Sequence, residues 1–328
     1  MPAKLGMVQG AMMEENFITS MIRSDGEATV FFNRPSDSPR IAMTHRPPTL
    51  LPDTGPRRAV LLAIAAAASG CALPARGPAD ADITPATFAP LLAAPHRRPA
   101  NVARDAARHP DGVLAFFGVR PDSRVVEILP GSGGYYLEIL APYLRERGQY
   151  IAANRGAGAP PAYLADHQRL LERLKAEPAR YDKVVVTAFD ADRHEIAPPG
   201  SADFVLTFRN LHNWMERDEV PASLRAFHRA LKPGGVLGVV DHRGRTDLSQ
   251  QAQMKNGYVR EDVAIEMIEK GGFRLVGRSE VNANPRDTKD HPEGVWTLPP
   301  TYRLKDTDRA RYQAIGESDR FTLKFIKR

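Results

Sequence analysis

The sequence predicts an α/β fold built around a doubly wound, mostly parallel sheet. From about residue 95 onward, short β-branched segments alternate with segments whose apolar residues recur at helical spacing. Glycine- and proline-rich turns separate the two kinds of segment. This alternation is typical of repeated strand–helix–strand units, which pair their strands in parallel and cover both faces of the sheet with helices.

Each expected element rests on a local pattern of side chains. Strands are expected where apolar, often β-branched runs are bounded by turn residues, at 124–129, 150–153, 183–189, 203–208, 236–240, 274–281 and 320–327. Helices are expected where apolar residues recur every three or four positions, at 102–109, 135–147, 163–176, 220–231 and 260–270. The polar stretch 282–318 is long for a connection, and its aromatic residues indicate that it packs as a lid over a ligand site.

The composition excludes several classes of protein. Apolar residues make up 42% of the 328 residues, which is too many for a wholly disordered chain. The net charge of +6 comes from scattered basic residues without a stripe of interleaved aromatics, so no nucleic-acid partner is expected. Cys71 is the single cysteine, so the chain forms no internal disulfide.

Residues 57–71 have the pattern of a bacterial export signal. Two arginines precede the apolar run 59–68, which is shorter than the roughly 20 residues of a membrane-spanning helix. The sequence Ala-Ser-Gly-Cys at 68–71 resembles a lipobox. That resemblance implies a lipoprotein of the periplasm, anchored to the outer membrane through lipidated Cys71. The alternative is an alanine-rich helix in a cytoplasmic protein.

The position of this signal sets the expected domain boundaries. A normal signal begins within a few residues of the start, and Met43 would restore that spacing. We therefore expect residues 1–42 to reflect a misassigned start codon. Residues 1–71 are then an N-terminal extension with the signal segment, the proline-rich residues 72–94 a linker, and 95–328 the folded domain.

A glycine-rich turn follows the first expected strand. In Gly131-Ser132-Gly133-Gly134, the absence of side chains lets the backbone approach a ligand, and the next helix offers free N–H groups. Many α/β proteins have such a turn for packing reasons alone. The third glycine of a dinucleotide-binding fingerprint would fall at position 136, where Tyr136 stands instead. The turn therefore disfavours a nicotinamide-dependent oxidoreductase.

The residues around this turn resemble a known family. Residues 125–133 resemble motif I of class I, Rossmann-like methyltransferases that use S-adenosylmethionine: Glu127, Gly131 and Gly133 match, and Leu129 replaces the first glycine. Residues 203–206, 231–235 and 271–273 resemble later motifs in the same order. The whole pattern resembles a bacterial branch of this superfamily whose members often carry export signals. The resemblance implies a seven-stranded sheet of order 3-2-1-4-5-7-6, with strand seven antiparallel.

The resemblance also implies a cofactor-binding set for S-adenosylmethionine. Its members are Glu127, Gly131, Gly133, Asn154, Asp190 and Asn210. The glycines would face the amino-acid portion of the cofactor, and Glu127 would support that loop. Asn154 stands where an acidic residue usually bonds the ribose hydroxyls. An uncharged asparagine cannot make the charge-assisted hydrogen bond that a carboxylate would make there. Asp190 is placed to meet the adenine amine or, equally, to form a turn or cap a helix.

Candidate catalytic residues follow the fourth and fifth expected strands. Because ligands bind at the carboxyl ends of strands in open α/β sheets, the loop 209–214 is well placed. His212 is a candidate general base, with Asn213 beside it; the alternative is a scaffolding role for both. His242 is a third candidate, oriented by Asp241, or else part of a solvated loop. No metal-ligand spacing is present, and His291 is expected to face solvent.

These observations favour an enzyme that transfers a methyl group from S-adenosylmethionine to a small-molecule acceptor. The sulfonium is already activated, so positioning supplies much of the acceleration and few catalytic groups are needed. The alternative is an exported protein of the same fold that binds a ligand or partner without methyl transfer. Leu129, Asn154 and the scarcity of the cofactor outside the cytoplasm favour that alternative, whereas the polar loop 209–214 favours the enzyme.

Overall fold

The computed structural model describes residues 82–156, 159–190 and 194–328. The expected N-terminal features, namely the start at 1–42, the export signal and the lipidation of Cys71, lie outside these residues. In the described part of the chain, none of the helices combines the length and the apolar character that a membrane crossing requires.

The sheet has eight strands in the order β4-β3-β2-β1-β5-β6-β8-β7. Their bounds are β1 Arg124–Ile128, β2 Gln149–Asn154, β3 Val185–Phe189, β4 His194–Glu195, β5 Ala202–Phe208, β6 Leu231–His242, β7 Phe273–Ser279 and β8 Arg320–Lys327. Apart from β4, this is the expected order 3-2-1-4-5-7-6, and β8 is antiparallel to both β6 and β7. The expected count of seven strands is one too low, because the two-residue β4 pairs antiparallel with β3.

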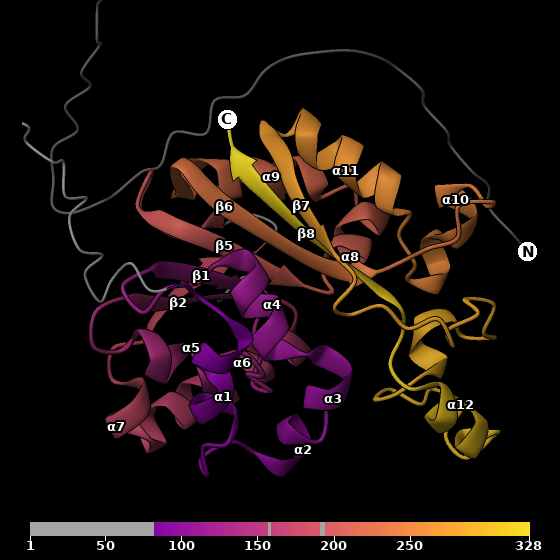
Figure 1. Cartoon of the computed structure of the whole chain (residues 1–328), viewed down its shortest axis with the longest axis horizontal. Helices are drawn as coiled ribbons and strands as arrows, with labels where there is room; N and C mark the ends of the chain where they lie inside the picture. Colours follow the sequence, from indigo (N-terminus) through magenta and orange to yellow (C-terminus); the bar gives the residue numbers. More distant parts are fainter. Residues whose placement is uncertain (1–81, 157–158, 191–193) are drawn as a thin grey trace, which may run out of the picture. The chain divides into compact units, whose positions relative to one another are not determined.

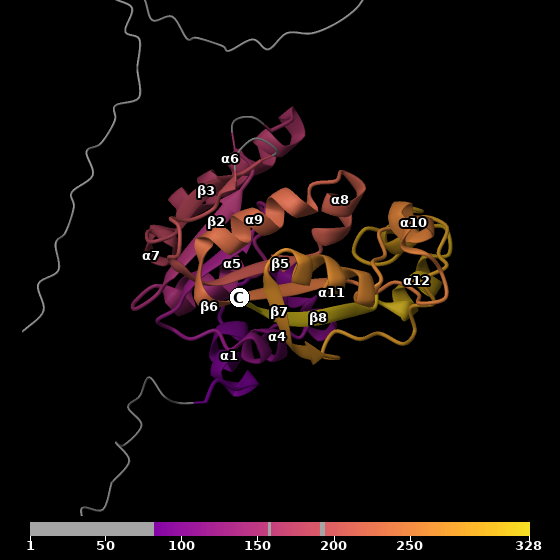
Figure 2. The ribbon, with the colours of Figure 1, turned by 90° about the horizontal axis from the view of Figure 1, so that it is seen from above.

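Helices cover both faces of the sheet, as Figures 1 and 2 show. The longer ones are α1 Pro85–Leu92, α4 Pro110–Phe117, α5 Leu137–Leu144, α6 Pro161–Ala176, α9 Val220–Ala230 and α11 Glu261–Lys270; the shorter ones are α2 Pro99–Val102, α3 Asp105–Arg108, α7 Pro178–Tyr181, α8 Leu211–Glu216, α10 Gln250–Gln253 and α12 Arg309–Ile315. One core contains residues of α1, α4 and α5, and the other contains residues of α8, α9 and α11. Successive residues of β1 alternate between these cores, Val125 facing the first and Val126 the second, as strand geometry requires.

The folded region begins earlier than the sequence indicates. Residues 85–92, within the expected linker, form α1, and Phe88 is fully buried against the core. The helix expected at 102–109 is reduced to the single turn α3, because the chain turns at 103–104 after α2 and again at His109, whose φ is 40°. Pro110 then begins α4, which includes the apolar residues 113–117.

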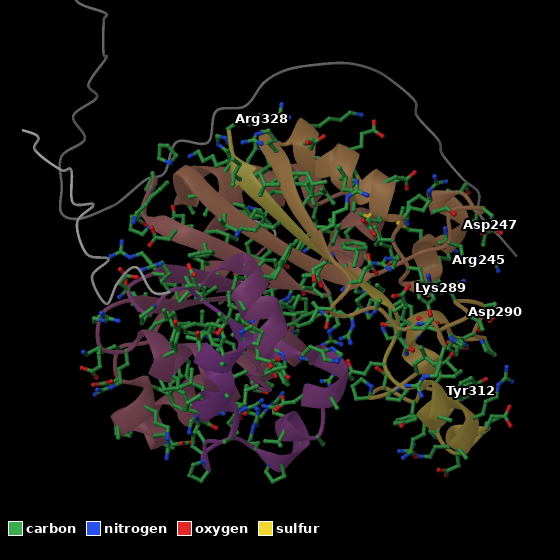
Figure 3. The ribbon with its side chains drawn as sticks, viewed as in Figure 1. Arg245, Asp247, Lys289, Asp290, Tyr312 and Arg328 are labelled. Atoms are coloured by element: carbon green, nitrogen blue, oxygen red, sulfur yellow. The ribbon has the colours of Figure 1, made fainter. Side chains whose placement is uncertain are left out.

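The segment between β7 and β8 folds beyond the carboxyl end of β6. It contains a 3-10 turn at Gly294–Thr297 and the helix α12. Figure 3 labels three of its residues, Lys289, Asp290 and Tyr312, in this region of the molecule. Tyr312 is buried, which agrees with the expectation that the segment packs.

Candidate functional site

The candidate site lies where the parallel strands end. The chain turns sharply after β1 and again after β5, with φ of 53° at Leu129 and 60° at Arg209. Both turns are tied to neighbouring strands, because Leu129 N donates to Ala153 O at 2.8 Å and Arg209 N donates to Val240 O at 2.8 Å. A left-handed backbone costs a residue with a side chain about 1–2 kcal/mol. Position 129, where the family motif has glycine, therefore keeps the left-handed backbone that glycine adopts easily, although leucine occupies it.

The first cavity, which we call the β2-side cavity, lies beside the glycine turn. Its lining includes Leu129, Gly131, Asn154, Asp166, Asn210 and Trp214. Asn210 holds the ends of β1 and β5 together, since its Nδ2 donates to Ile128 O at 3.2 Å and to Thr207 Oγ1 at 3.1 Å. Asn154 at the end of β2 is buried, with its Nδ2 3.5 Å from His167 Nδ1.

Asp166 is a residue of this cavity that the sequence analysis missed. It extends from α6, and its carboxylate accepts from Ser132 N at 3.0 Å and from Ser132 Oγ at 2.5 Å. It therefore fixes the glycine turn and adds a negative charge near Asn154, where the expected acid is absent. In the sequence, Asp166 is one polar residue of an amphipathic helix, and only its packing against the turn distinguishes it.

The second cavity, the α3-side cavity, lies on the other side of the same turn. Its lining includes Arg104, Arg108, Glu127, Gly133, Tyr135 and Arg209, and it shares Leu129 with the β2-side cavity. Glu127 accepts a hydrogen bond from Tyr150 Oη at 2.5 Å. Burial raises the pKa of Glu127 to about 7, against the lowering effects of Tyr150 and Arg108.

The third cavity, the β6-side cavity, lies between α8 and the segment that precedes β8. Its lining includes Arg209, His212, Asn213, His242, Trp296 and Ser318. Val295, Trp296 and residues 299–301, all from the stretch 282–318, form one of its walls. Since helical residues are about 100° apart, His212 and Trp214 project to opposite sides of α8. His212 thus faces the β6-side cavity, Trp214 faces the β2-side cavity, and Asn213 lines both.

His212 and Asp241 form a buried hydrogen-bonded pair at this cavity. His212 Nδ1 lies 2.9 Å from Asp241 Oδ1, and the Asp241 side chain is fully buried. The carboxylate also accepts from the backbone N–H of His212 at 3.3 Å and of His242 at 2.7 Å. The adjacent histidine and these bonds hold the pKa of Asp241 below its ordinary value despite burial, which acts in the opposite direction. Asp241 is therefore an ionised acceptor that fixes His212 with its proton on Nδ1.

The expected pairing of Asp241 with the His242 imidazole is wrong. Adjacent residues of a strand project to opposite faces, so the Asp241 carboxylate reaches α8 and only the backbone N–H of His242. His242 Nδ1 instead lies 2.5 Å from Ser318 Oγ. Burial keeps the pKa of His242 well below its ordinary value, and nearby positive charges add to this effect, so this imidazole is neutral at pH 7.

Two further expectations differ from the structure. Asp190 lines none of the three cavities; both of its carboxylate oxygens accept from Gly156 N, at 2.9 and 2.8 Å. This bond ties the loop after β2 to the end of β3, 34 residues along the chain, and a role toward adenine gains no support from the position of Asp190. His291, expected in solvent, is buried and hydrogen-bonded to Asp287 at 2.9 Å.

One group in the described residues has the arrangement of a metal site. Ligand atoms of His212, Asp241 and His242 lie within 4.8 Å of one another, although no metal-ligand spacing is visible in the sequence. Two observations oppose a cation there. The Asp241 carboxylate already accepts three hydrogen bonds. The positive charges of Arg209 and Arg320 also act on His242.

Comparison with known proteins identifies the domain. Residues 147–239 match the family described as methyltransferase domain. The chain carries a methyltransferase domain. Its strand order, apart from β4, is the one implied by the resemblance to class I methyltransferases, whose cofactor is S-adenosylmethionine. A search among curated proteins finds no significant match to the sequence.

Solved structures show related folds at low sequence identity to this chain. A SAM-dependent methyltransferase from Aquifex aeolicus is 17% identical, with a TM-score of 0.47, and the match covers 74% of this chain and 98% of that one. The [4+2]-cyclase SpnF is 17% identical, with a TM-score of 0.44, covering 67% and 81%. Phosphoethanolamine N-methyltransferase 2 from Haemonchus contortus, in complex with S-adenosyl-L-methionine, is 17% identical, with a TM-score of 0.43, covering 69% and 57%.

Proposed function

We propose that this protein transfers the methyl group of S-adenosylmethionine to a small molecule in the β6-side cavity, with His212 as the general base. The observation that carries the proposal is the His212–Asp241 pair, which faces a cavity adjoining the other two. Asn213 connects this cavity to the β2-side cavity, and Arg209 connects it to the α3-side cavity. An acceptor there would lie next to a cofactor that occupies the other two.

The residues of these two cavities fit the chemical groups of the cofactor. Asn154 and Asp166 offer oxygen acceptors for the ribose hydroxyls, and Trp214 offers an aromatic surface. In the α3-side cavity, Glu127 offers a carboxylate for the ammonium of the amino-acid portion. When bound, the cofactor supplies a methyl group activated by the sulfonium. Leu129 borders both cavities. It stands where the family motif has a glycine, and its side chain takes up space that a glycine would leave to the cofactor.

His212 is set up to accept a proton from the acceptor. Because its Nδ1–H donates to Asp241, the neutral imidazole keeps a lone pair on Nε2. That atom takes the proton from an oxygen or nitrogen of the acceptor as the nucleophile attacks the methyl carbon. Asp241 then stabilises the imidazolium that forms, and such a positioned base accelerates reactions by about 10²–10⁴-fold.

The size of the β6-side cavity favours a small molecule over a macromolecule. Its volume is about 170 Å³, which is room for roughly ten water molecules. Trp296, Pro299 and Pro300 give it an apolar wall, and the histidines give it a polar one. An acceptor of about ten non-hydrogen atoms with a flat apolar body and an ionisable hydroxyl or amine fits this lining.

We also propose that the protein acts in the periplasm, attached to the outer membrane through Cys71. The support for this placement is the sequence of residues 57–71, which precede the described residues. Mass spectrometry of the native protein tests it: a lipidated N-terminal Cys71 is expected, and a peptide from before residue 43 would contradict it.

The test of the proposed reaction begins with the cofactor. Calorimetric titration of S-adenosylhomocysteine into the full chain is expected to show micromolar binding, which Gly131→Arg abolishes. Its absence at millimolar ligand would favour the alternative, a binding protein without methyl transfer. Activity is then measured as S-adenosylhomocysteine release with a panel of small phenols and amines.

The variant His212→Ala is expected to lower kcat about 10²–10⁴-fold with little change in cofactor affinity. His228→Ala is the control, because His228 lines none of the three cavities. Unchanged kcat in His212→Ala would contradict the base. Activity lost on chelation and restored by zinc would instead assign His212, Asp241 and His242 to a metal.

A further inference from the structure

Four arginines from three parts of the chain meet beside the candidate site. Arg104, Arg108 and Arg320 surround Glu317, with shortest nitrogen–oxygen distances of 2.6, 3.6 and 2.9 Å. Arg209, at the turn after β5, is the fourth. Among the described residues, its guanidinium has no hydrogen-bond or ion-pair partner, yet it borders both the β6-side and the α3-side cavity.

The positive charge in this region exceeds the negative charge. The four guanidiniums face one ionised carboxylate, that of Glu317. Glu127, the other acid nearby, has a pKa of about 7 and is only partly ionised at neutral pH. Arg108 and Arg320 are almost fully buried, with 5% and 3% of their surface exposed. Buried charge without a counter-charge costs several kcal/mol, so this arrangement calls for an anion.

Several buried donors of the same cluster also lack acceptors. Arg104 Nη2, Arg108 Nη2 and Arg320 Nε are buried nitrogens without a hydrogen-bond partner. Such groups are rare in folded proteins, because an unpaired buried donor loses its water without replacement. Arg104 and Arg108 line the α3-side cavity, so a ligand oxygen there can reach this cluster.

The cofactor does not balance this charge. S-adenosylmethionine carries one carboxylate, but also an ammonium and a sulfonium, so it adds a net positive charge. Its carboxylate could occupy part of the α3-side cavity and would still leave Arg209 facing the β6-side cavity. The other reactant can supply the remaining negative charge.

We propose that the methyl acceptor carries an anionic group, a carboxylate or a phosphate, bound by Arg209 in the β6-side cavity. This inference rests on the proposed function and names the class of its substrate. The guanidinium offers a fork of N–H donors that matches carboxylate and phosphate oxygens. Glu317 also lines this cavity, but its charge is paired with Arg104, Arg108 and Arg320. His212 and Trp296 line it too, so the anionic group, the apolar body and the nucleophile of one small molecule each meet a suitable side chain.

The two tryptophans of the chain allow a direct test. Trp214 lines the β2-side cavity and Trp296 the β6-side cavity, and the sequence has no third. In the full chain carrying Trp214→Phe, fluorescence therefore reports on Trp296 alone. The probes are benzoate, phenyl phosphate and the neutral benzamide, each titrated with saturating S-adenosylhomocysteine present. If this variant fails to fold, calorimetry with the unmodified chain replaces fluorescence.

At least one anionic probe is expected to bind tenfold or more tightly than benzamide, which is the effect of one charge-assisted hydrogen bond. Arg209→Gln should remove this preference. Arg274→Gln, the same charge change at an exposed residue outside the three cavities, should retain it. Benzoate and phenyl phosphate then show which oxyanion the site prefers.

The outcomes separate this inference from the proposed function. S-adenosylhomocysteine binding without any preference for anionic probes overturns the inference and leaves the methyltransferase proposal standing. Equal losses of probe and S-adenosylhomocysteine affinity in Arg209→Gln also overturn it, because Arg209 would then serve the cofactor carboxylate. Anion preference without S-adenosylhomocysteine binding supports the anion site and contradicts the methyl transfer.

Discussion

Two buried histidine–aspartate pairs in the described residues have the same nitrogen–oxygen distance and different surroundings. His212–Asp241 and His291–Asp287 both have nitrogen–oxygen distances of 2.9 Å. Asp287 also accepts from Tyr258 Oη, Lys289 N and Asp319 N, and His291 borders none of the three cavities. Asp241 accepts otherwise only backbone N–H groups, and its histidine faces a cavity. The His212–Asp241 pair is therefore open to a ligand through its cavity, whereas the His291–Asp287 pair is enclosed by protein.

Removing the histidine should give the largest difference in stability between the two pairs. His291→Ala removes one of the four groups that donate to the Asp287 carboxylate and leaves a gap in a closed core, and we expect a loss of about 3 kcal/mol of unfolding free energy. His212→Ala should cost about 1 kcal/mol, because water in the β6-side cavity can solvate Asp241. Urea denaturation of both variants measures the difference. Equal losses would show that the cavity gives Asp241 no access to water.

The charge state of Glu317 makes the stability of a second buried charged group depend on pH. Its arginine neighbours hold the pKa of Glu317 at about 2, against 4.5 ordinarily, although burial acts in the opposite direction. The carboxylate therefore contributes stability above pH 4.5, of about 3 kcal/mol, and this contribution is lost as the pH falls toward 2. Glu317→Gln should remove this acid-dependent loss, whereas the exposed Glu266→Gln should not. A pH series of urea denaturation from 7 to 3 measures it, and identical profiles of Glu317→Gln and the unmodified chain would contradict it.

The exposed pair Arg245–Asp247 should give the smallest effect. Both residues are labelled in Figure 3, and their nitrogen and oxygen are 2.6 Å apart. Solvent screens such a pair, and ordering two long side chains offsets most of the attraction. Arg245→Ala should leave the Tm unchanged within the error of differential scanning calorimetry. A drop in Tm comparable with that of His291→Ala would mean that distance alone, and not burial, decides how much a charged pair contributes to stability.

The sequence predicted the sheet well because its central strands β1, β2 and β5 are buried on both faces. The run 124–129 and the segment 320–327 became β1 and β8 almost residue for residue. Helices of the region 95–117 were predicted less well, since prolines and a left-handed His109 divide it into short pieces. In such pieces, tertiary contacts decide the conformation and periodicity has too few turns to be read.

Within the candidate site, the sequence predicted where the loops lie but not which side chains bond to one another. His212 and Asn213 were placed correctly at the strand ends, because that edge follows from the topology. The predicted partner of Asp241 was wrong. The prediction chose His242 because it is the next residue, but side chains of adjacent strand residues point to opposite faces, and Asp241 bonds His212. Arg104, Arg209 and Glu317 come from distant segments, so their charge cluster is invisible before the chain folds.

The reversal of β8 also bears on the order in which the protein folds. Because β8 runs against β6, its first residue pairs with the last residue of β6, His242 with Arg320. Glu317 and Ser318 thus reach the site only when the last described strand inserts between β6 and β7. Closing so long a stretch of chain is entropically slow. During synthesis, the cavity around His212 would therefore form late, and a nascent chain would be unable to bind an acceptor before its fold is complete.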